Sequence, residues 1–278
     1  MIIDGKKTRD ALRPGLMERI SRFPRKPKLV IISVAERADS LMYIGAKKTY
    51  GEALGVDVVH SPLPESVTQE ELIAKVQKIQ SDPLVDGIIC QLPFPKHISP
   101  VEVIDTIDPT KDADALSGYH VTQLLRGNTS YIPATTRGIF ALLKTYNFEI
   151  TQKKITIIGR SDLVGKPTAL MCLAMGATVT IAHSQTEDLK AAVKDADIII
   201  SATGKKNLIM GDMVHADQII IDVGINKDGE NQIHGDVNWG EVAPIVQAIT
   251  PVPGGVGPMT VHCLFENLVD LVEKQNVV

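Results

Sequence analysis

The sequence has few cysteines, no excess of positive charge and no long apolar run. Its three cysteines, Cys90, Cys172 and Cys263, are isolated and lack CxxC spacing, so they indicate neither a disulfide framework nor a zinc site. No apolar stretch approaches the roughly 18 residues of a transmembrane helix, and the charged start MIIDGKKTRD is unlike a signal peptide. A net charge of −4 provides no basic surface for nucleic acid or an anionic membrane. We therefore expect a cytoplasmic protein without a metal site and without nucleic-acid or membrane partners.

Two catalytic motifs are also missing. The sequence contains neither HExxH nor GxSxG, so zinc-dependent hydrolysis and nucleophile-elbow esterase chemistry have no support. The composition is ordinary for a globular protein, with 44% hydrophobic and 22% charged residues. The length of 278 residues predicts two domains, because a domain typically has roughly 100–200 residues.

The first half of the chain alternates apolar runs with amphipathic stretches. The pattern predicts strands at 28–34, 56–61 and 85–93 and helices at 39–55 and 68–81. This order of strand, helix, strand, helix and strand is typical of parallel βαβ units. The following segment, 93–135, is rich in Pro, Asp and Gly, and we expect it to carry site loops and short helices.

The second half predicts another set of parallel strands. A strand over 153–159 precedes a helix from Gly165 to about Met175. Three further strands are predicted in ATVTIAHS, DADIIISATG and ADQIIIDVGIN, whose Val and Ile runs are typical of strands covered by helices on both faces. The segment PVPGGVGP (251–258) has too much Pro and Gly for a helix or a central strand. The helical spacing of apolar residues predicts a final helix over 259–278.

A glycine-rich turn at 155–170 is the most informative local feature. Gly159 ends a strand and Gly165 opens a helix, whose exposed amides and positive dipole end favour a phosphate. Pro167 replaces the Ser or Thr of a P-loop, and Ser161 replaces the second glycine of GxGxxG. The turn therefore predicts either a phosphate-bearing ligand or a tight turn without one.

The next strand bears on which dinucleotide would bind. NAD-binding folds usually place an acid at the end of their second strand, where it bonds to the ribose 2′-hydroxyl. Here that strand ends in His183 and Ser184, and the first carboxylate is Glu187. Because an acid would repel a 2′-phosphate whereas Arg160 would attract it, the pattern favours NADP if a dinucleotide binds. A strand-end histidine without a ligand is the alternative for His183.

Polar residues in the first half form a second candidate site. Tyr43 and Lys47 are four residues apart and share one helix face. Lys47 either belongs to a solvated basic surface or sits in a pocket, where desolvation would lower its pKa and allow proton transfer near neutrality. Gln91 follows a buried strand, and Asp112 and Asp114 lie in a loop, positions at which open α/β sheets bind ligands.

Short segments spread over nearly the whole chain resemble one family. They are IIDGK near the start, Y-x-x-x-K (43–47), VDGIICQLPFP (85–95), KDAD (111–114), IIGRSDLVGKP (157–167), TVTIAHSQT (178–186), IDVGIN (221–226), GDVN (235–238) and TPVPGGVGPMT (250–260). Together they resemble the bifunctional 5,10-methylenetetrahydrofolate dehydrogenase/5,10-methenyltetrahydrofolate cyclohydrolase family. The chain departs from the family pattern at Ala115, in place of a common glycine, and at Ala134 and Thr136, where Cys-Thr-Pro is usual. The segment VAERADS (34–40) is also unlike the glycine- and aspartate-containing turn that usually precedes the tyrosine helix.

The resemblance implies roles for individual residues. Lys47 would be the catalytic lysine of the cyclohydrolase step, Gln91 its hydrogen-bond partner, and Tyr43 the ring packed against folate. Asp114 would hold the pterin edge, and the loop with Pro253, Gly254 and Gly255 would separate folate from nicotinamide. The implied cofactor-binding residues are Gly159, Arg160, Ser161, Gly165, His183, Ser184 and Ile225.

The implied architecture has two α/β domains. A catalytic βαβ domain is expected over 1–125, completed by the C-terminal helix (258–278), and a Rossmann-type NADP-binding domain over 140–257. The implied function is the NADP-dependent oxidation of 5,10-methylenetetrahydrofolate and the hydrolysis of its product to 10-formyltetrahydrofolate, by a homodimer in one-carbon metabolism and purine biosynthesis. A monofunctional dehydrogenase and a non-catalytic NADP-binding regulator are the alternatives.

Overall fold

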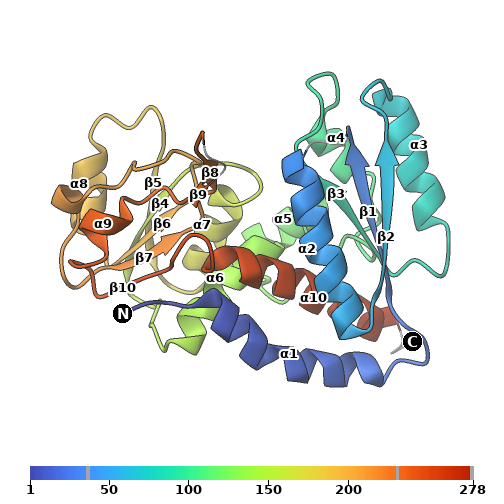
Figure 1. Cartoon of the computed structure of the whole chain (residues 1–278), viewed down its shortest axis with the longest axis horizontal. Helices are drawn as coiled ribbons and strands as arrows, with labels where there is room; N and C mark the ends of the chain where they lie inside the picture. Colours follow the sequence, from blue (N-terminus) through green and yellow to red (C-terminus); the bar gives the residue numbers. More distant parts are fainter. Residues whose placement is uncertain (36–37, 230–231, 276–278) are drawn as a thin grey trace. The chain divides into compact units, whose positions relative to one another are not determined.

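The computed structural model describes residues 1–35, 38–229 and 232–275 (Figure 1). The chain forms two compact units. The three-stranded unit contains Leu12–Gln123 and the chain from Val261 onward, and the five-stranded unit contains Met1–Ala11 and Leu124–Thr260. Among the described residues, no helix combines the length and the apolar character needed to cross a membrane.

Three parallel strands and two helices build the first of these units. In chain order they are β1 (Lys28–Val34), α2 (Ala38–Leu54), β2 (Asp57–Leu63), α3 (Gln69–Gln80) and β3 (Gly87–Gln91). The strand order is β2-β1-β3, so β2 and β3 are added to the sheet on opposite sides of β1. Connections between parallel strands follow a right-handed rule, which for this strand order predicts α2 and α3 on opposite faces of the sheet, where Figure 1 shows them.

A capping box fixes the start of α3. The Thr68 side chain accepts a hydrogen bond from the Glu71 backbone N–H, and the Glu71 carboxylate accepts one from the Thr68 N–H at 2.9 Å. These two bonds satisfy amide groups that a helix otherwise leaves without partners, and such a cap contributes about 1 kcal/mol. The sequence signal T-Q-E-E therefore has a direct structural counterpart.

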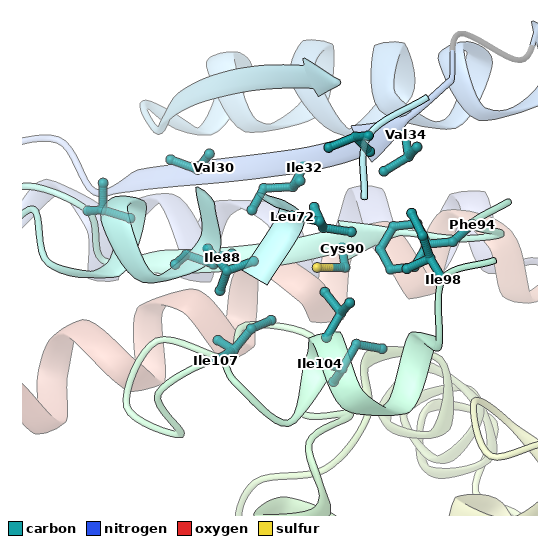
Figure 2. Close-up of a cluster of buried hydrophobic side chains, with 14 residues drawn as sticks. Val30, Ile32, Val34, Leu72, Ile88, Cys90, Phe94, Ile98, Ile104 and Ile107 are labelled. Atoms are coloured by element: carbon teal, nitrogen blue, oxygen red, sulfur yellow. The ribbon is translucent and has the colours of Figure 1, made fainter. Parts of the chain in front are cut away.

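The face of the sheet toward α3 carries the core shown in Figure 2. Val30, Ile32 and Ile88 project from the strands toward Leu72 of α3, and Ile104 of α4 (Pro100–Ile104) closes the cluster. Burying each such side chain stabilises the fold by roughly 1.5–3 kcal/mol. Helix α10 (Val256–Gln275) packs on the other side of β3, where a Cβ added at Gly87 would lie 2.5 Å from the Leu268 side chain.

The five-stranded unit is a second parallel sheet. Its elements are β4 (Lys154–Ile158), α7 (Gly165–Ala174), β5 (Thr178–Ala182), α8 (Leu189–Lys194), β6 (Ile198–Ser201), η1 (Gly211–Met213), β7 (Ile219–Asp222) and β10 (Ala248–Ile249). The strand order is β10-β7-β6-β4-β5, so β5 is added on one side of β4 and the later strands on the other. Open α/β sheets bind ligands at the position where the order of strands reverses in this way. A short antiparallel hairpin, β8 (Asn226–Lys227) and β9 (Ile233–His234), and helix α9 (Trp239–Val242) follow β7.

The expectation that all strands of this sheet are buried was wrong for β5. Four of its five residues are at least partly exposed, and Ile181 keeps 43% of its surface accessible. The reason is topological, because β5 is the edge strand next to β4 and has no further strand on its other side. The sequence carried a signal of this exposure, because β5 alternates Thr with Val and Ile, whereas β6 and β7 each begin with three consecutive Ile residues.

Four of the described α-helices were not predicted, namely the short α8 and α9 and the longer α1 and α6. Helix α1 (Gly5–Ser21) contains Pro14 in its interior, which argues against a helix in the sequence. Its start is capped by Asp4, whose carboxylate accepts a hydrogen bond of 2.8 Å from the Lys7 N–H. Helix α6 (Ala134–Thr145) begins where an irregular segment was expected to end, and seven of its residues are buried. The short helix α5 (Gly118–Leu125) agrees with the expectation of short helices in 93–135.

The expected boundary of the last helix was also wrong. Helix α10 begins at Val256, inside the PVPGGVGP segment, because a proline in a first helical turn lacks only an amide that has no partner there. The predicted helix extended to residue 278, but 276–278 lie outside the described residues.

The compact units differ from the predicted domains at the N-terminus. The prediction grouped residues 1–11 with the catalytic domain, whereas Met1–Ala11 belong to the five-stranded unit. The physical reason is a parallel bridge between Ile2 and Ile249 and a hydrogen bond of 2.9 Å from the Ile3 N–H to the Ile249 carbonyl. The assignment of a catalytic and an NADP-binding role to these parts of the chain stays a prediction.

The two family departures in α6 lie in the core of the five-stranded unit. Ala134 and Thr136 are fully buried. The Thr136 hydroxyl is 3.2 Å from that of Thr168 in α7, so it has a hydrogen-bond partner in its buried position. Thr136 therefore joins α6 to α7.

Candidate active site

Lys47 lies beside Gln91 in the three-stranded unit. The Lys47 Nζ donates a hydrogen bond of 2.7 Å to the Gln91 Oε1, and Gln91 Nε2 donates one of 3.0 Å to the Leu92 carbonyl. The second bond fixes the amide so that its oxygen faces the lysine. The structure thus brings together the helix residue and the strand-end residue that the sequence singled out separately.

Burial lowers the pKa of Lys47. Removal from water disfavours the ammonium form, and the negative charge of Asp114 opposes this effect. Gln91 accepts a hydrogen bond without adding a charge, so it orients Lys47 without strengthening the ammonium form as a carboxylate would. A lysine in this environment can exchange a proton closer to neutral pH than a surface lysine can.

Asp114 has the opposite shift. Burial raises its pKa to about 6, while the charge of Lys47 lowers it and that of Asp112 raises it. Burial also raises the pKa of Asp112, against hydrogen bonds from Ser117 and from backbone amides. The two acids and the lysine therefore interact as one electrostatic group. Asp112 is buried, and Lys47 and Asp114 are half-buried.

The loop that carries Asp114 is tied down on several sides. The Asp112 carboxylate accepts a hydrogen bond of 2.9 Å from the Ser117 N–H, and the Ala113 N–H donates to the Ile88 carbonyl of β3. Asn267 of α10, itself fully buried, donates to the Ala113 carbonyl at 3.2 Å. These bonds fix where Asp114 lies relative to the sheet.

Tyr43 occupies the turn of α2 before Lys47 and is partly exposed. The side chain of Lys48, which follows Lys47 in the sequence, is instead 54% exposed and pairs loosely with Glu52 at 3.9 Å. The helix thus presents one half-buried lysine and one solvated lysine as neighbours, which the sequence pattern could not distinguish.

A pocket of about 330 Å³ opens at the carboxyl ends of β4, β5 and β6 in the five-stranded unit. Its walls contain five predicted cofactor residues, which are Gly159, Arg160, Ser161, His183 and Ser184. The Arg160 guanidinium donates a hydrogen bond of 3.0 Å to the Gln185 side chain and is otherwise exposed. The described walls carry two cations, Arg160 and Lys205, and no carboxylate, which suits a ligand with several phosphates.

The N-terminus of α7 lies next to this pocket. Ser161 Oγ accepts hydrogen bonds from the backbone N–H groups of Val164 and Gly165 at 3.3 and 3.4 Å, so the serine acts as a cap. A Cβ added at Gly165 would lie 2.3 Å from the Gly159 carbonyl oxygen. Glycine at 165 therefore permits the close approach of helix and strand turn, the role of the third glycine in dinucleotide folds.

Some predicted residues lie elsewhere in the same unit. The described walls of the pocket include neither Gly165 nor Ile225, whose side chain is 44% exposed after β7. In the loop with Pro253, the Gly254 carbonyl accepts hydrogen bonds of 3.0 Å from the Gly5 and Lys6 N–H groups. A Cβ on Gly5 would lie 1.8 Å from the Gly255 oxygen, which explains the glycine of the IIDGK segment.

Five further residues that line the pocket were not predicted from the sequence. They are Ala202, Thr203, Lys205 and Leu208, which follow β6, and Leu189, which begins α8. The signal was present in SATGKK, because ligands in open α/β sheets also contact the loop after the strand next to the reversal point.

A second hollow, of about 460 Å³, opens at the amino ends of β1 and β2 and includes Arg25 and Lys28. It lies at the opposite end of the sheet from Gln91, and Arg25 is engaged by the buried Asp86 at 2.7 Å. Nowhere in the described ranges do three or more His, Cys, Asp or Glu side chains gather so as to hold a metal ion.

Comparison with known proteins identifies a family for both parts of the chain. Residues 3–114 match the family model described as tetrahydrofolate dehydrogenase/cyclohydrolase, catalytic domain. Residues 133–276 match the NAD(P)-binding domain of the same family. The bifunctional protein FolD 2 of Geobacter metallireducens is 39% identical over 276 residues, which cover 98% of this chain and 97% of that protein.

Solved structures agree. The bifunctional FolD enzyme of Campylobacter jejuni superposes with a TM-score of 0.96 at 37% identity and 99% coverage of both chains. The Trypanosoma brucei FolD, solved with NADP and an inhibitor, gives 0.95 at 32% identity and covers 100% of this chain and 99% of its own. On these matches over its whole length, the chain belongs to the tetrahydrofolate dehydrogenase/cyclohydrolase family.

Proposed function

We propose that this chain catalyses both reactions of its family, oxidising 5,10-methylenetetrahydrofolate with NADP and hydrolysing the resulting methenyl compound to 10-formyltetrahydrofolate. The observation that carries the hydrolytic half is the hydrogen bond between Lys47 and Gln91, around a lysine whose pKa burial lowers. A monofunctional dehydrogenase has no need of such a lysine for proton transfer.

In the hydrolytic step, Lys47 acts as the base. The methenyl carbon is electrophilic, so a water oxygen adds to it when a base removes a proton from that water. The neutral Lys47 amine accepts this proton, and Gln91 holds the amine in place through its oxygen. The adduct then opens by cleavage of the bond between this carbon and N5. The nitrogen takes up the proton held by Lys47, and the hydroxyl proton of the adduct is released to solvent, which leaves the formyl group on N10 of the folate.

Folate recognition is assigned to Asp114 and Tyr43. A carboxylate accepts two N–H bonds from the edge of a pterin, a charge-assisted pairing that is stronger than one between neutral groups. The hydrogen bonds around Asp112 and Ala113 keep this loop rigid enough to fix that pairing. Tyr43, one turn before Lys47, offers an aromatic ring for packing against the folate.

NADP fits the pocket of the five-stranded unit. When bound, it supplies a nicotinamide ring that accepts the hydride of the dehydrogenase reaction. Arg160 is placed to attract the 2′-phosphate, and His183 and Ser184 stand where an NAD enzyme would carry an acid. Hydride transfer needs positioning more than acid–base help, so the pocket's task is orientation.

We further propose that the enzyme works as a cytoplasmic homodimer and supplies formyl groups for purine biosynthesis. The edge strand β5 supports self-association, because an edge strand can pair with a strand of another chain. Its Ile181 and Leu173 of the adjoining helix α7 are also exposed large hydrophobic residues, at 43% and 56%. Sedimentation analysis of the wild type and of Ile181→Lys tests this surface. A monomeric wild type would contradict the proposal.

The decisive experiment for the activity is a pair of assays on the purified chain. Methylenetetrahydrofolate is supplied with NADP or with NAD at matched concentrations, and methenyltetrahydrofolate is supplied alone. We expect turnover in both assays and a preference for NADP. Oxidation without hydrolysis above the uncatalysed rate would identify a monofunctional dehydrogenase, and binding of NADP without any turnover would identify a regulator.

A further inference from the structure

Two sequence segments, IDVGIN and GDVN, place two buried acids in the five-stranded unit. Asp222 ends β7, and Asp236, with no exposed surface, follows β9. A Cβ at Gly224 would lie 2.0 Å from Asp236 Oδ1, and one at Gly235 would lie 1.9 Å from Asp222 Oδ2. Each segment therefore needs its glycine because the carboxylate of the other segment occupies that space.

The Asp236 carboxylate accepts five hydrogen bonds. Oδ2 accepts from Ser201 Oγ at 2.8 Å, from the Thr203 N–H at 2.7 Å and from Thr203 Oγ1 at 2.9 Å. Oδ1 accepts from the Lys205 N–H at 2.9 Å and from Asn226 Nδ2 at 3.2 Å. A buried carboxylate with this many donors is held rigidly, and it holds its donors equally.

Three of these five hydrogen bonds are donated by Thr203 and Lys205, which both line the proposed NADP pocket. The same loop meets the glycine turn, because the Ala202 N–H donates to the Ile158 carbonyl at 2.8 Å. A Cβ at Gly159 would lie 2.5 Å from the Ala202 oxygen. The position of this loop thus sets the width of the pocket between the turn after β4 and the loop after β6.

We propose that Asp236 is a positioning residue for the dinucleotide site, which holds the 202–205 loop so that Lys205 adds a second cation to the pocket. This inference rests on the proposed NADP-dependent function. It assigns a role to the GDVN segment, whose Asp236 holds the backbone amides of Thr203 and Lys205 in place.

Asp236→Asn tests the proposal with little change in shape. One oxygen becomes an NH₂ group that faces backbone N–H donors, so the loop must move. Because hydrogen bonds to a charged group contribute more than neutral ones, we expect the KM for NADP to rise at least roughly tenfold. The expected kcat at saturating NADP stays within about threefold, and hydrolysis of methenyltetrahydrofolate, which uses no NADP, stays within about twofold.

Asp228→Asn is the matched control. Asp228 is a carboxylate of the same unit that pairs with His234 at 2.6 Å and with Lys206 at 3.5 Å, and neither partner lines the described pocket. It should leave the KM for NADP unchanged. A parallel loss of both activities in Asp236→Asn, with an unchanged KM for NADP, would mean that Asp236 only stabilises the fold and would overturn the proposal.

If Asp236→Asn does not fold, Thr203→Val decides the question. It removes one donor to Oδ2 and keeps the side-chain shape, and we expect a rise of about threefold in the KM for NADP. An unchanged KM would overturn the proposal. Direct titration of the wild type with NADP separates the two ideas, because a wild type that does not bind NADP refutes the function, whereas equal binding by wild type and variant refutes only the role of Asp236.

Discussion

The two candidate sites solve different chemical problems, and their polar groups differ accordingly. In the three-stranded unit, Lys47 and Asp114 are withdrawn from water, and burial lowers the pKa of the first and raises that of the second. In the five-stranded unit, Arg160 and Lys205 are exposed, and the buried acid Asp236 has its carboxylate oxygens directed at neutral donors. Proton transfer requires groups that can change charge near neutral pH, whereas phosphate binding requires charges that stay constant.

The strongest test of this contrast is Lys47→Met, which keeps much of the side-chain length but removes the amine. We expect cyclohydrolase activity to fall roughly 100-fold or more, the scale of a general-base contribution. Dehydrogenase activity should survive in part. Both rates are measured on the purified variant, with Lys48→Met as the control on the solvated face of the same helix. Retained hydrolysis would remove Lys47 from the mechanism.

Asp114→Ala should impair both activities, because both reactions need bound folate. Loss of a charge-assisted pair of hydrogen bonds predicts a rise of roughly tenfold or more in the KM for folate. NADP affinity should stay within about twofold, since Arg160 and the pocket walls are untouched. Titration with NADP and steady-state kinetics check the two halves, and an unchanged folate KM would refute the assignment of Asp114.

The pH dependence separates the sites in the wild type. With a pKa of about 6, Asp114 is ionised above that pH and becomes protonated as the pH falls through it. Folate binding should therefore weaken below about pH 6. The rate of hydrolysis should fall more steeply than the rate of oxidation, because the lower pH also protonates the Lys47 amine that accepts the proton from water. Rate profiles of both reactions between pH 5 and roughly 9 test this. A hydrolysis rate that rises on acidification would contradict the base role of Lys47.

Arg160→Ala should have a smaller effect that is confined to the cofactor. Removal of an exposed cation from a 2′-phosphate predicts a loss of roughly 1–2 kcal/mol, or about tenfold in the KM for NADP. The KM for NAD, which lacks that phosphate, should change much less. Lys166→Ala, outside the described walls of the pocket, serves as the control. Equal losses for the two cofactors would place the 2′-phosphate elsewhere.

The smallest expected effect concerns the loop of Asp114. Ala115 is fully buried with a φ of 56°, in the left-handed region where a Cβ costs roughly 1–2 kcal/mol. Ala115→Gly relieves this cost and loses a buried methyl group worth about 0.8 kcal/mol. In denaturant unfolding, Ala115→Gly should lower the free energy of unfolding by at least about 1 kcal/mol less than Ala113→Gly does. Ala113 is also fully buried but has no positive φ, so glycine relieves no strain there. Equal losses would contradict this explanation.

The sequence alone was sufficient for the family, the two parallel α/β sheets and the residues of the candidate sites that stand at strand ends. Gly159, Ser161 and Gly165 could be interpreted locally, because a strand–turn–helix is built from neighbouring residues and its capping needs no distant partner. The predicted family and fold class are confirmed. The separate roles of the site residues stay predictions.

Tertiary structure decided everything that depends on distant partners. The helical spacing of Tyr43 and Lys47 could not tell a solvated lysine from a half-buried one, since the pKa of Lys47 depends on its burial and on the charge of Asp114 from another part of the chain. In the same way, the sequence predicted β5 as a buried strand, but the order of strands in the folded sheet puts it at an edge. Asp236 carried no sequence signal for the cofactor pocket, because its donors lie 10 to 35 residues away and meet it only when β6, β7 and the β8–β9 hairpin have folded together.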